Sequence, residues 1–557
     1  MSACALLIAC SGCMAGPNYQ SPIPQLPSDW QSTPKSGHAL EIENIVQTVN
    51  LGRGVVAHDY AYSLSSTQCP WWEVFLDEDL RCLIGMQRAR SPRLHELRAA
   101  IDQAWHNRWN SKLGFFPEIT GATGYESFLS NSEPAGTRLH SNLLSASVDW
   151  ELDLFGGRQR EVEAADRNVE AQVETYRNGM VFLASEIGLF YTDYRVAEAR
   201  IQLQLDNIEL YEQVVRVTRE KLEFGGVAQV DLDEAEARLS REVAALPNLE
   251  GIRDEAKIEL ARVVGVYSEE LDPLLTPNQA IPSPGRQIIV PSPSDVLPLR
   301  PDIRRQERQI GRQVALVAKE VADLYPTLNF SYTWNGGDLA LPILNPSTLG
   351  FLIQNARRLV DFERERASIK AAEAQLQREL HNYQLGLVTA SSEIENAIVD
   401  LQIAGKRLAS LELALAKNKQ AFDRVYDAYL SSLVDVRDII RIQGDLLATQ
   451  TEYIFAQNLL AKGTVRLYKA VGGIDVPAIP ARMLESPYQV ADASQGNPFL
   501  SRVLSLGRDT QETLQTNRVK ARIGRQPWYH VGEDGVLRNG VPNENPFLNR
   551  MWNLPAR

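Results

Sequence analysis

The sequence lacks the short motifs that identify most enzymes. It contains no GxxxxGK[ST] phosphate loop, no HExxH zinc motif, no GxSxG nucleophile elbow and no glycine-rich loop placed after a strand. Its 7 histidines are scattered without the spacing of metal ligands, and its 6 methionines form no ladder that would bind copper or silver. We therefore expect no enzyme activity, no cofactor and no metal.

The sequence also has few cysteines and no long apolar run. No stretch approaches the ~18 consecutive apolar residues of a transmembrane helix. Three of the 5 cysteines lie within residues 1–13. Cys69 and Cys82 remain, and they either pair in an oxidising compartment or stay two separate thiols, because sequence does not show their geometry. The net charge of −13 argues against nucleic acid as a partner, since phosphate binding needs a basic face.

An apolar leader occupies the N-terminus. Residues 3–9 are apolar and are followed by small residues and Cys13, which resembles the end of a bacterial lipoprotein signal, cleaved before a cysteine that then receives lipid. Residues 7–10 (LIAC) match the same pattern. We therefore predict a signal peptide over 1–12 and a lipid anchor on Cys13. Cys10 is the alternative anchor, and a buried N-terminal hydrophobic strand is the alternative to any anchor.

The chain repeats itself once. Residues 91–94 (SPRL) are matched by 300–303 (RPDI), at an offset of 209 (300 − 91). Residues 225–231 are matched by 429–435, at an offset of 204 (429 − 225). Two halves of roughly equal length therefore share one order of elements, which is the signature of an internal repeat.

The repeat divides the chain into six segments. The segment between the halves is rich in proline and is interpreted as a linker. The tail contains clusters of glycine, proline and asparagine together with large aromatic residues, and is either a disordered periplasmic extension or a partner-binding tail. In chain order, the predicted segments are the signal peptide 1–12, an N-terminal extended segment 13–71, the first repeat 72–265, the linker 266–292, the second repeat 293–472 and the C-terminal extension 473–557.

Each half contains two stretches in which polar and apolar residues alternate. In residues 145–154, Asp149 and Glu151 fall on one face while Trp150 and Leu152 fall on the other. Such strands suit a transmembrane barrel in which lipid takes the apolar face and a wet lumen the polar face. A soluble pair of hairpins would show the same pattern. Four strands cannot close a barrel, but three copies would supply twelve. The predicted strands cover 115–129, 139–154, 326–337 and 348–360.

Apolar residues recur with the heptad period of a coiled coil. From Leu376 to Leu415 they step by 4 and 3 without a miss, and a similar seam runs from Tyr176 to Ile201. The predicted long helices, 157–224 and 361–428, contain no proline, and ~68 residues at 1.5 Å each would span ~100 Å. Shorter helices over 229–264 and 434–471 would fold back on them as antiparallel coiled coils.

Several motifs together resemble one family. Residues 150–156 (WELDLFG) with Arg158, and residues 297–304 (LPLRPDIR), resemble the signatures of TolC-like outer-membrane factors. Residues 468–473 (YKAVGG) resemble the end of their last helix, and residues 13–19 (CMAGPNY) resemble the mature start of NodT-type efflux lipoproteins. The resemblance implies an α+β membrane protein that forms a homotrimer. Its 12-stranded outer-membrane β-barrel, with four strands per chain, would be continued by a long periplasmic α-helical barrel.

The same resemblance implies partners and a periplasmic gate. The partners would be outer-membrane lipid, a periplasmic adaptor (membrane fusion protein) and an inner-membrane pump of the resistance-nodulation-division (RND) type. The gate residues carried over by position are Asp231, Tyr426, Asp435 and Asp438. Threefold symmetry would bring six carboxylates from Asp435 and Asp438 close together, and packed like charges of this kind attract cations. The alternative role of Asp231 and Asp435 is to cap the second helix of each hairpin.

Two departures from the family pattern concern the second hairpin. Tyr429 stands where the family has glycine, and Ser431 stands where some members have a basic residue that ties the closed gate. The predicted function is an outer-membrane channel subunit of a tripartite efflux system, lipid-anchored, with a large periplasmic portion. It would passively conduct drugs or other small molecules. The alternatives are an export duct for type I protein secretion and a non-channel periplasmic coiled-coil scaffold.

Overall fold

The computed structural model describes most of the chain between residues 71 and 472. The described residues are 14–24, 26–27, 29–31, 39–41, 61–63, 71–130, 137–284, 287–289, 292–325, 327–337, 348–354, 362–472, 529–531 and 537–539. Predictions about the signal peptide, Cys10, Cys13, Cys69 and most of the C-terminal extension lie outside them. The chain divides into two compact units, 1–484 and 485–557. Of the second unit, the structure describes one antiparallel pair, β8 (Tyr529–Val531) with β9 (Leu537–Asn539).

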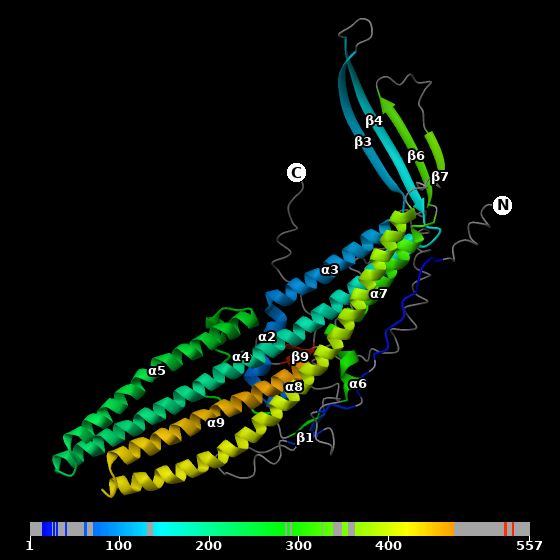
Figure 1. Cartoon of the computed structure of the whole chain (residues 1–557). Coiled ribbons are helices and arrows are strands. Elements are labelled where there is room, and N and C mark those ends of the chain that lie inside the picture. The colour runs from blue at the N-terminus through cyan, green and yellow to red at the C-terminus, as the bar shows by residue number, and fades with distance from the viewer. Residues whose placement is uncertain are drawn as a thin grey trace. The chain divides into compact units, whose positions relative to one another are not determined.

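Two very long helices organise the first unit (Figure 1). They are α4 (Gly157–Glu223, 67 residues) and α8 (Phe362–Leu430, 69 residues). Each turns back into a shorter helix, α5 (Gln229–Val264) after α4 and α9 (Val436–Ala470) after α8. The predicted heptad seam is the buried face of α8. Its buried members are Tyr383, Ala390, Ile394, Ala397, Leu401, Ala404 and Leu408.

The helices pack as a layer four helices wide. At the end away from the sheet, α5 packs on α4, α4 on α9 and α9 on α8. At the end near the sheet, α3 (Pro92–Leu113) packs on α4, and α7 (Pro301–Ala322) packs between α4 and α8. The order is therefore α5–α4–α9–α8 at one end and α3–α4–α7–α8 at the other. This leaves α3, α5 and α8 at the two edges of the layer.

The two shorter helices on each side meet end to end at a glycine. Gly265 and Gly472 follow α5 and α9 with φ of +88° and +90°, a left-handed conformation that costs glycine little. A Cβ at Gly265 would lie 2.7 Å from Cδ of Pro92, the first residue of α3, and a Cβ at Gly472 would lie 2.9 Å from Cγ of Arg300, just before α7. Both junctions therefore require glycine, and their offset is 207 (472 − 265).

A four-stranded antiparallel sheet extends from the helices, in the order β3–β4–β6–β7 (Figure 1). Its strands are β3 (Glu118–Ser130), β4 (Thr137–Leu152), β6 (Thr327–Gly337) and β7 (Thr348–Gln354). β3 begins three residues later than predicted because Phe115 and Phe116 donate backbone hydrogen bonds back to the end of α3. β4 ends two residues early because the Asp153 carboxylate accepts from the backbone N–H of Gln159 in the first turn of α4. Residues 355–360, predicted as strand, lie outside the described residues.

Sequence reasoning missed a small three-stranded sheet. β5 (Gln287–Ile289) pairs antiparallel with β1 (Ala39–Glu41) and parallel with β2 (Ala61–Ser63). The segments interpreted as a linker and as an extended N-terminus are thus joined to each other. Strands of three residues are too short to show a period of two. A further short helix, α2 (Glu78–Arg90), precedes α3. Within the part of the chain that is described, no helix is both long and apolar enough to span a membrane.

Candidate functional site

The far ends of the two helical hairpins are built alike. In the first turn, Gly225 has φ of +71° and the N–H of Gly226 donates to the carbonyl of Lys221 at 2.8 Å. In the second turn, Ser432 has φ of +58° and the N–H of Leu433 donates to the carbonyl of Ala428, also at 2.8 Å. In both turns, the N–H that follows the left-handed residue donates to a carbonyl in the last turn of the helix, which is a common way for a helix to end.

This geometry corrects the predicted equivalence of the two tips. Gly225 corresponds to Ser432, at an offset of 207 (432 − 225), and not to Tyr429 at 204. The position that favours glycine is therefore occupied by Ser432 in the second hairpin, whereas Tyr429 is an ordinary helical residue of α8. Matching the two halves by residue identity gave the wrong alignment, because the left-handed residue of the turn is glycine in the first hairpin and serine in the second.

The predicted gate carboxylates lie at the starts of α5 and α9. The Asp231 carboxylate accepts from the backbone N–H of Ala228 at 3.0 Å, which supports the capping role considered for it. Asp435 is the N-cap residue of α9, but its exposed side chain makes no capping bond. Asp438 donates its backbone N–H to the carbonyl of Asp435 at 3.1 Å, as Asp231 does to Ala228 at 3.0 Å. Asp231 therefore corresponds to Asp438 (438 − 231 = 207).

Tyr426 lies on the side of α8 that faces α4. Its ring stacks on Phe422 with centroids 5.7 Å apart, and its hydroxyl donates a long hydrogen bond of 3.4 Å to Oε1 of Gln213. These contacts belong to the packing between the hairpins. The structure thus places the Tyr426 side chain of α8 against α4.

Arg437 is a residue of the tip that sequence reasoning missed. It lies two residues after Asp435 on α9 and reaches across to α5, where its Nε donates to Oε2 of Glu234 at 3.1 Å and its Nη2 lies 3.8 Å from Oδ1 of Asp231. At this tip a basic side chain of the second hairpin, Arg437, thus pairs with acids of the first hairpin, although Ser431 is not basic. The available signal was that Arg437 stands between two aspartates in the sequence, in a turn rich in carboxylates with which an arginine can pair.

Tyr429 is a large buried side chain at the tip, with 1% of its surface exposed. Its hydroxyl shares a 2.6 Å hydrogen bond with Oγ1 of Thr218 on α4. The Lys221 ammonium donates to the carbonyl of Tyr429 and lies 3.9 Å from the centre of its ring, a cation–π contact. Burial raises the pKa of Tyr429 and lowers the pKa of Lys221.

An apolar cluster surrounds Tyr429 and joins all four helices of the tip. Such a contiguous buried cluster is the unit that holds neighbouring elements together. By contrast, Phe224 and Leu433 project from the two turns with 89% and 77% of their surfaces exposed. The buried members of the cluster are Val214, Val215, Leu232, Ala235, Tyr429, Val436 and Ile439.

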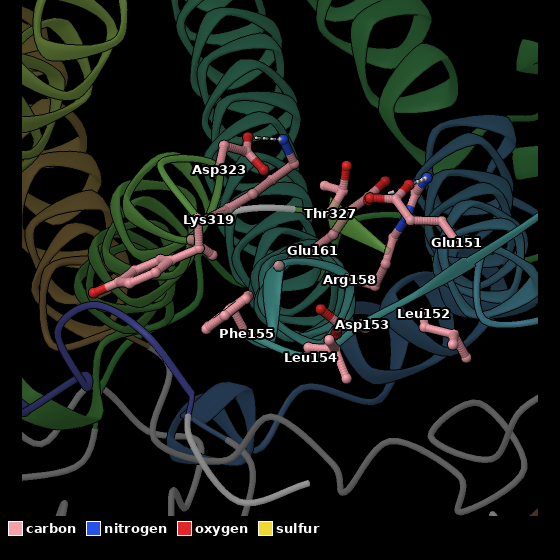
Figure 2. Close-up of a pocket in the computed structure, with 13 residues that line it drawn as sticks. Glu151, Leu152, Asp153, Leu154, Phe155, Arg158, Glu161, Lys319, Asp323 and Thr327 are labelled. Atoms are coloured by element: carbon pink, nitrogen blue, oxygen red, sulfur yellow. Dashed lines mark hydrogen bonds and ion pairs between the residues drawn. The ribbon is translucent and has the colours of Figure 1, made fainter. Parts of the chain in front are cut away.

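At the opposite end, the strand-to-helix junction is a charged pocket of about 180 Å³. Figure 2 shows Arg158 between two acids, with Nη2 donating to Glu151 at 3.0 Å and Nη1 to Glu161 at 3.4 Å. Lys319 of α7 pairs with Asp323 at 3.1 Å. The lining therefore carries more acids than bases, and each base is already paired.

The first described residues of the chain lie against this junction. The backbone N–H of Ala15 donates to the carbonyl of Phe155 at 3.0 Å. Gly16 passes so close to α7 that a Cβ there would lie 2.5 Å from Cα of Ala318. Arg160, 1% exposed, donates to Oδ1 of Asn18 at 2.7 Å. The Gly-Pro-Asn-Tyr motif is thus a docking segment, held at the base of the sheet.

Two helical hairpins that continue a four-stranded sheet define a two-repeat α+β protein. Comparison with known proteins shows the family to which it belongs. The family described as outer membrane efflux protein matches residues 83–266 and 292–473, more than half of the chain. This chain belongs to the outer membrane efflux protein family, and its place is the outer membrane.

Individual relatives agree with the family match. Nodulation protein T of Rhizobium leguminosarum bv. trifolii is 22% identical over 469 residues, covering 83% of this chain and 94% of that protein. Cation efflux system protein CusC of Escherichia coli (strain K12) is 22% identical over 485 residues, covering 85% of this chain and 100% of that protein. The solved structure of the outer-membrane channel OprN has a TM-score of 0.69 at 24% identity, covering 84% of this chain and 100% of that chain, which shows the shared fold.

Proposed function

We propose that three copies of this chain close into one passive efflux channel. The observation that carries the proposal is that the sheet and the helix layer are both open rows, each with an edge element on either side. Four strands run β3–β4–β6–β7 and four helices run α5–α4–α9–α8, and each row has two edges to pair. Exposed strand edges invite pairing with another chain, and rotational symmetry closes such rows into rings. Three copies give twelve strands, within the size range of outer-membrane barrels.

The edge helices carry the apolar surface that such closure would bury. On α8, Leu385 and Leu413 each have 65% of their surfaces exposed although neither belongs to the buried seam. On α5, Ile258 is 57% exposed and Val243 48% exposed. A row of exposed large apolar residues on both edges marks an interaction surface. A second copy of the same chain is the partner that matches both edges at once.

The two ends of the channel have different proposed roles. At the sheet end, the docking segment supports Cys13 as the lipid anchor, because an acyl chain two residues before Ala15 would enter the membrane beside the strands. At the hairpin end, Asp231, Asp435 and Asp438 would form the acidic periplasmic gate, with Tyr426 behind them. A periplasmic adaptor would grip this end, and an inner-membrane RND-type pump would supply the energy.

The cargo of the channel is proposed as drugs or other small molecules. In β4, Asp149 and Glu151 alternate with Trp150 and Leu152, and such a strand would turn an acidic face to a water-filled passage. The predicted repeats 72–265 and 293–472 would each contribute two strands and one hairpin to this passage. An export duct for type I protein secretion would share every feature described. Only the cargo therefore distinguishes that function from small-molecule efflux.

The test is made on outer membranes from cells that express the full chain. A channel subunit should resist carbonate extraction, migrate as a trimer before heating and conduct ions in planar bilayers. A deletion strain should accumulate more of a fluorescent dye, and the full chain should restore its efflux. A carbonate-extractable monomer without conductance would support the coiled-coil scaffold instead. Mass spectrometry of the mature N-terminus should find an acylated Cys13, and an unmodified Met1 would remove the anchor from the proposal.

A further inference from the structure

A groove of about 670 Å³ lies beside the first glycine junction, where α5 ends against the start of α3. Phe182, Leu183 and Val263 give it an apolar wall, and four charged residues line it as well. Ligand pockets in proteins measure ~300–1,000 Å³, so this groove has room for more than one side chain.

Three of the four charged groove residues already have a partner of opposite charge. The pairs are Arg93 with Glu96 at 2.5 Å, Arg262 with Glu259 at 2.7 Å and Glu270 with Arg90 at 3.0 Å. The fourth is Glu186 of α4, which is half-buried and has no ion pair or hydrogen bond of its side chain within the described residues. The Lys469 ammonium lies over the Phe182 ring instead, 4.7 Å from its centre. The groove therefore presents a carboxylate without a cation.

The second glycine junction shows which group binds such a carboxylate. Nη2 of Arg300 donates to Glu393 at 2.8 Å and to Asp302 at 2.7 Å, and Nη1 donates to the carbonyl of Ala470 at 2.5 Å. That carbonyl belongs to the last turn of α9, where carbonyls lack partners within the helix and attract positive charge. One guanidinium thus satisfies two carboxylates and a helix end at once.

The backbones of the two junctions place Ser91 where Arg300 stands. A Cβ on Gly265 would lie 3.1 Å from Cα of Ser91, and a Cβ on Gly472 would lie 3.2 Å from Cα of Arg300. The dihedral angles agree as well, with φ −60° and ψ 119° at Ser91 against φ −61° and ψ 129° at Arg300. The two residues are therefore equivalent in space, and only the side chain differs.

Two of the three acceptors of the second junction recur in the first. Glu186 corresponds to Glu393 and Val263, in the last turn of α5, corresponds to Ala470, both at an offset of 207 (393 − 186 and 470 − 263). The third acceptor is replaced by Arg93, whose side chain is 59% exposed. The first junction thus keeps most of a guanidinium site but has no guanidinium in it.

We propose that this groove is a docking site for an arginine side chain of a partner polypeptide. Ser91 is too short to supply the group that Arg300 supplies in the second half, so the guanidinium comes from outside the chain. It donates to the Glu186 carboxylate and to the carbonyl of Val263, while Phe182 covers its aliphatic stem. This inference does not rest on the proposed channel function.

Two features favour an arginine on a polypeptide over a lysine or a small free cation. The planar fork of a guanidinium reaches two acceptors at once, whereas an ammonium is a compact and strongly hydrated point charge. The groove is also larger than one guanidinium requires, and the residues on either side of the arginine occupy the rest of its apolar wall.

The test uses the full chain, purified in detergent, and a peptide with a fluorophore at its C-terminus. The peptide is acetylated Pro-Leu-Arg-Pro, which repeats residues 298–301. Fluorescence anisotropy should show saturable binding, at least threefold tighter than that of Pro-Leu-Lys-Pro. Equal affinity of the two peptides, or no saturable binding, would overturn the proposal. If N-butylguanidinium displaces the labelled peptide as well as the unlabelled peptide does, the site takes small cations and the polypeptide partner is wrong.

Two variants remove the site in different ways. Glu186→Gln should weaken binding of the arginine peptide at least tenfold, because it removes the charged acceptor. Ser91→Arg should weaken it as strongly, because the chain's own guanidinium then occupies the groove. The control is Glu220→Gln, the same change of charge on an exposed residue of α4 that lies 34 residues farther along (220 − 186), or ~51 Å. It should stay within about twofold of the parent. Binding that survives Glu186→Gln would contradict the proposal.

A gain of affinity is the sharper test. Arg93→Asp restores the third acceptor of the second junction and removes the cation that opposes the arginine. It should tighten binding of the arginine peptide about threefold. An unchanged or weaker affinity, in a variant that unfolds at the temperature of the parent, would mean that the groove does not bind a guanidinium as the second junction does.

Discussion

The two places where helices meet end to end differ although their backbones match. In the second half, the 6% exposed Arg300 fills the junction, donating to the Asp302 and Glu393 carboxylates at 2.7 and 2.8 Å and to the carbonyl of Ala470 at 2.5 Å. In the first half the same position is Ser91, and a groove of about 670 Å³ remains there, lined in part by Glu186. Glu186 corresponds to Glu393 (393 − 186 = 207). A repeat can therefore keep its backbone while only one copy keeps the charged side chain.

The comparison also shows what each junction depends on. In the second half, burial raises the pKa of Asp302, but the hydrogen bond and charge of Arg300 outweigh it and hold that pKa below its ordinary value. In the first half, Arg93 stands where Asp302 would be (302 − 93 = 209), so that position carries a base instead of an acid. The second junction is held by the buried pair of Arg300 and Asp302, whereas the ion pair beside the first junction, Arg90 with Glu270 at 3.0 Å, is exposed.

The largest effect should come from Arg300→Ala. It removes a buried guanidinium and leaves Asp302 without its cation, which should cost about 3 kcal/mol of the free energy of unfolding. Urea denaturation of the detergent-solubilised protein, followed by circular dichroism, measures it. Ser91→Ala is the matched change; Ser91 is buried, but its side chain makes no capping hydrogen bond, so the change should cost about 1 kcal/mol or less. Equal losses in the free energy of unfolding at the two positions would contradict the conclusion that only the second junction depends on a charged side chain.

Next in size are Gly265→Ala and Gly472→Ala. Each forces a left-handed alanine whose Cβ overlaps the next helix, which should cost about 2–3 kcal/mol, nearly the same in both halves. Thermal unfolding measures both. Gly85→Ala in α2 is the control, because nothing lies within 4 Å of a Cβ there, and it should stabilise by about 0.5–1 kcal/mol. A cost at only one junction would mean that the two backbones are not equivalent in energy.

A smaller effect is expected where the tips exchange glycine and serine. Ser432→Gly should relieve a left-handed serine and stabilise the second turn by about 0.5–1 kcal/mol, whereas Gly225→Ser should destabilise the first turn by a similar amount. Hydrogen exchange of the Leu433 and Gly226 amides reports on each turn separately. If Ser432→Gly speeds exchange at Leu433, the equivalence of these two positions is wrong.

The smallest effect should be that of Ser91→Arg. The new guanidinium can reach Glu186 in the groove as Arg300 reaches Glu393, but Arg93 opposes it, so the gain should be about 0.5 kcal/mol or less. Thermal unfolding of Ser91→Arg is compared with that of the double variant Ser91→Arg and Glu186→Gln. A gain that survives the second change would come from packing alone.

The long elements could be predicted well because their signals are repeated many times. The helix predicted over 229–264 coincides with α5, and the heptad seam of α8 is its buried face. The α+β class and the family were predicted from motifs at the strand-to-helix corners, and the family is confirmed. The two glycine-containing junctions explain why residues 91–94 and 300–303 match, since both sequences begin a helix against the end of another.

Single-residue features could not be predicted in the same way. Ser432 adopts the conformation of a glycine, so letter matching shifted the tip alignment by three residues. Arg437 and Glu234 are three-dimensional neighbours on helices far apart in sequence. Tyr429 looks like a substituted turn residue, and only packing shows that it is the buried centre of the tip. The gate residues and the anchor stay predictions.

The close passage of Gly16 against Ala318 has a consequence for the order of assembly. The docking segment is the earliest described part of the chain, yet it is hydrogen-bonded to Phe155 of the first half and lies against Ala318 of the second. Its seat is complete only after about 300 further residues (318 − 16 = 302) have been exported and folded. A lipid on Cys13 would thus enter the membrane before the segment that follows it can dock. It would hold the subunit at the bilayer until both halves have folded around that segment.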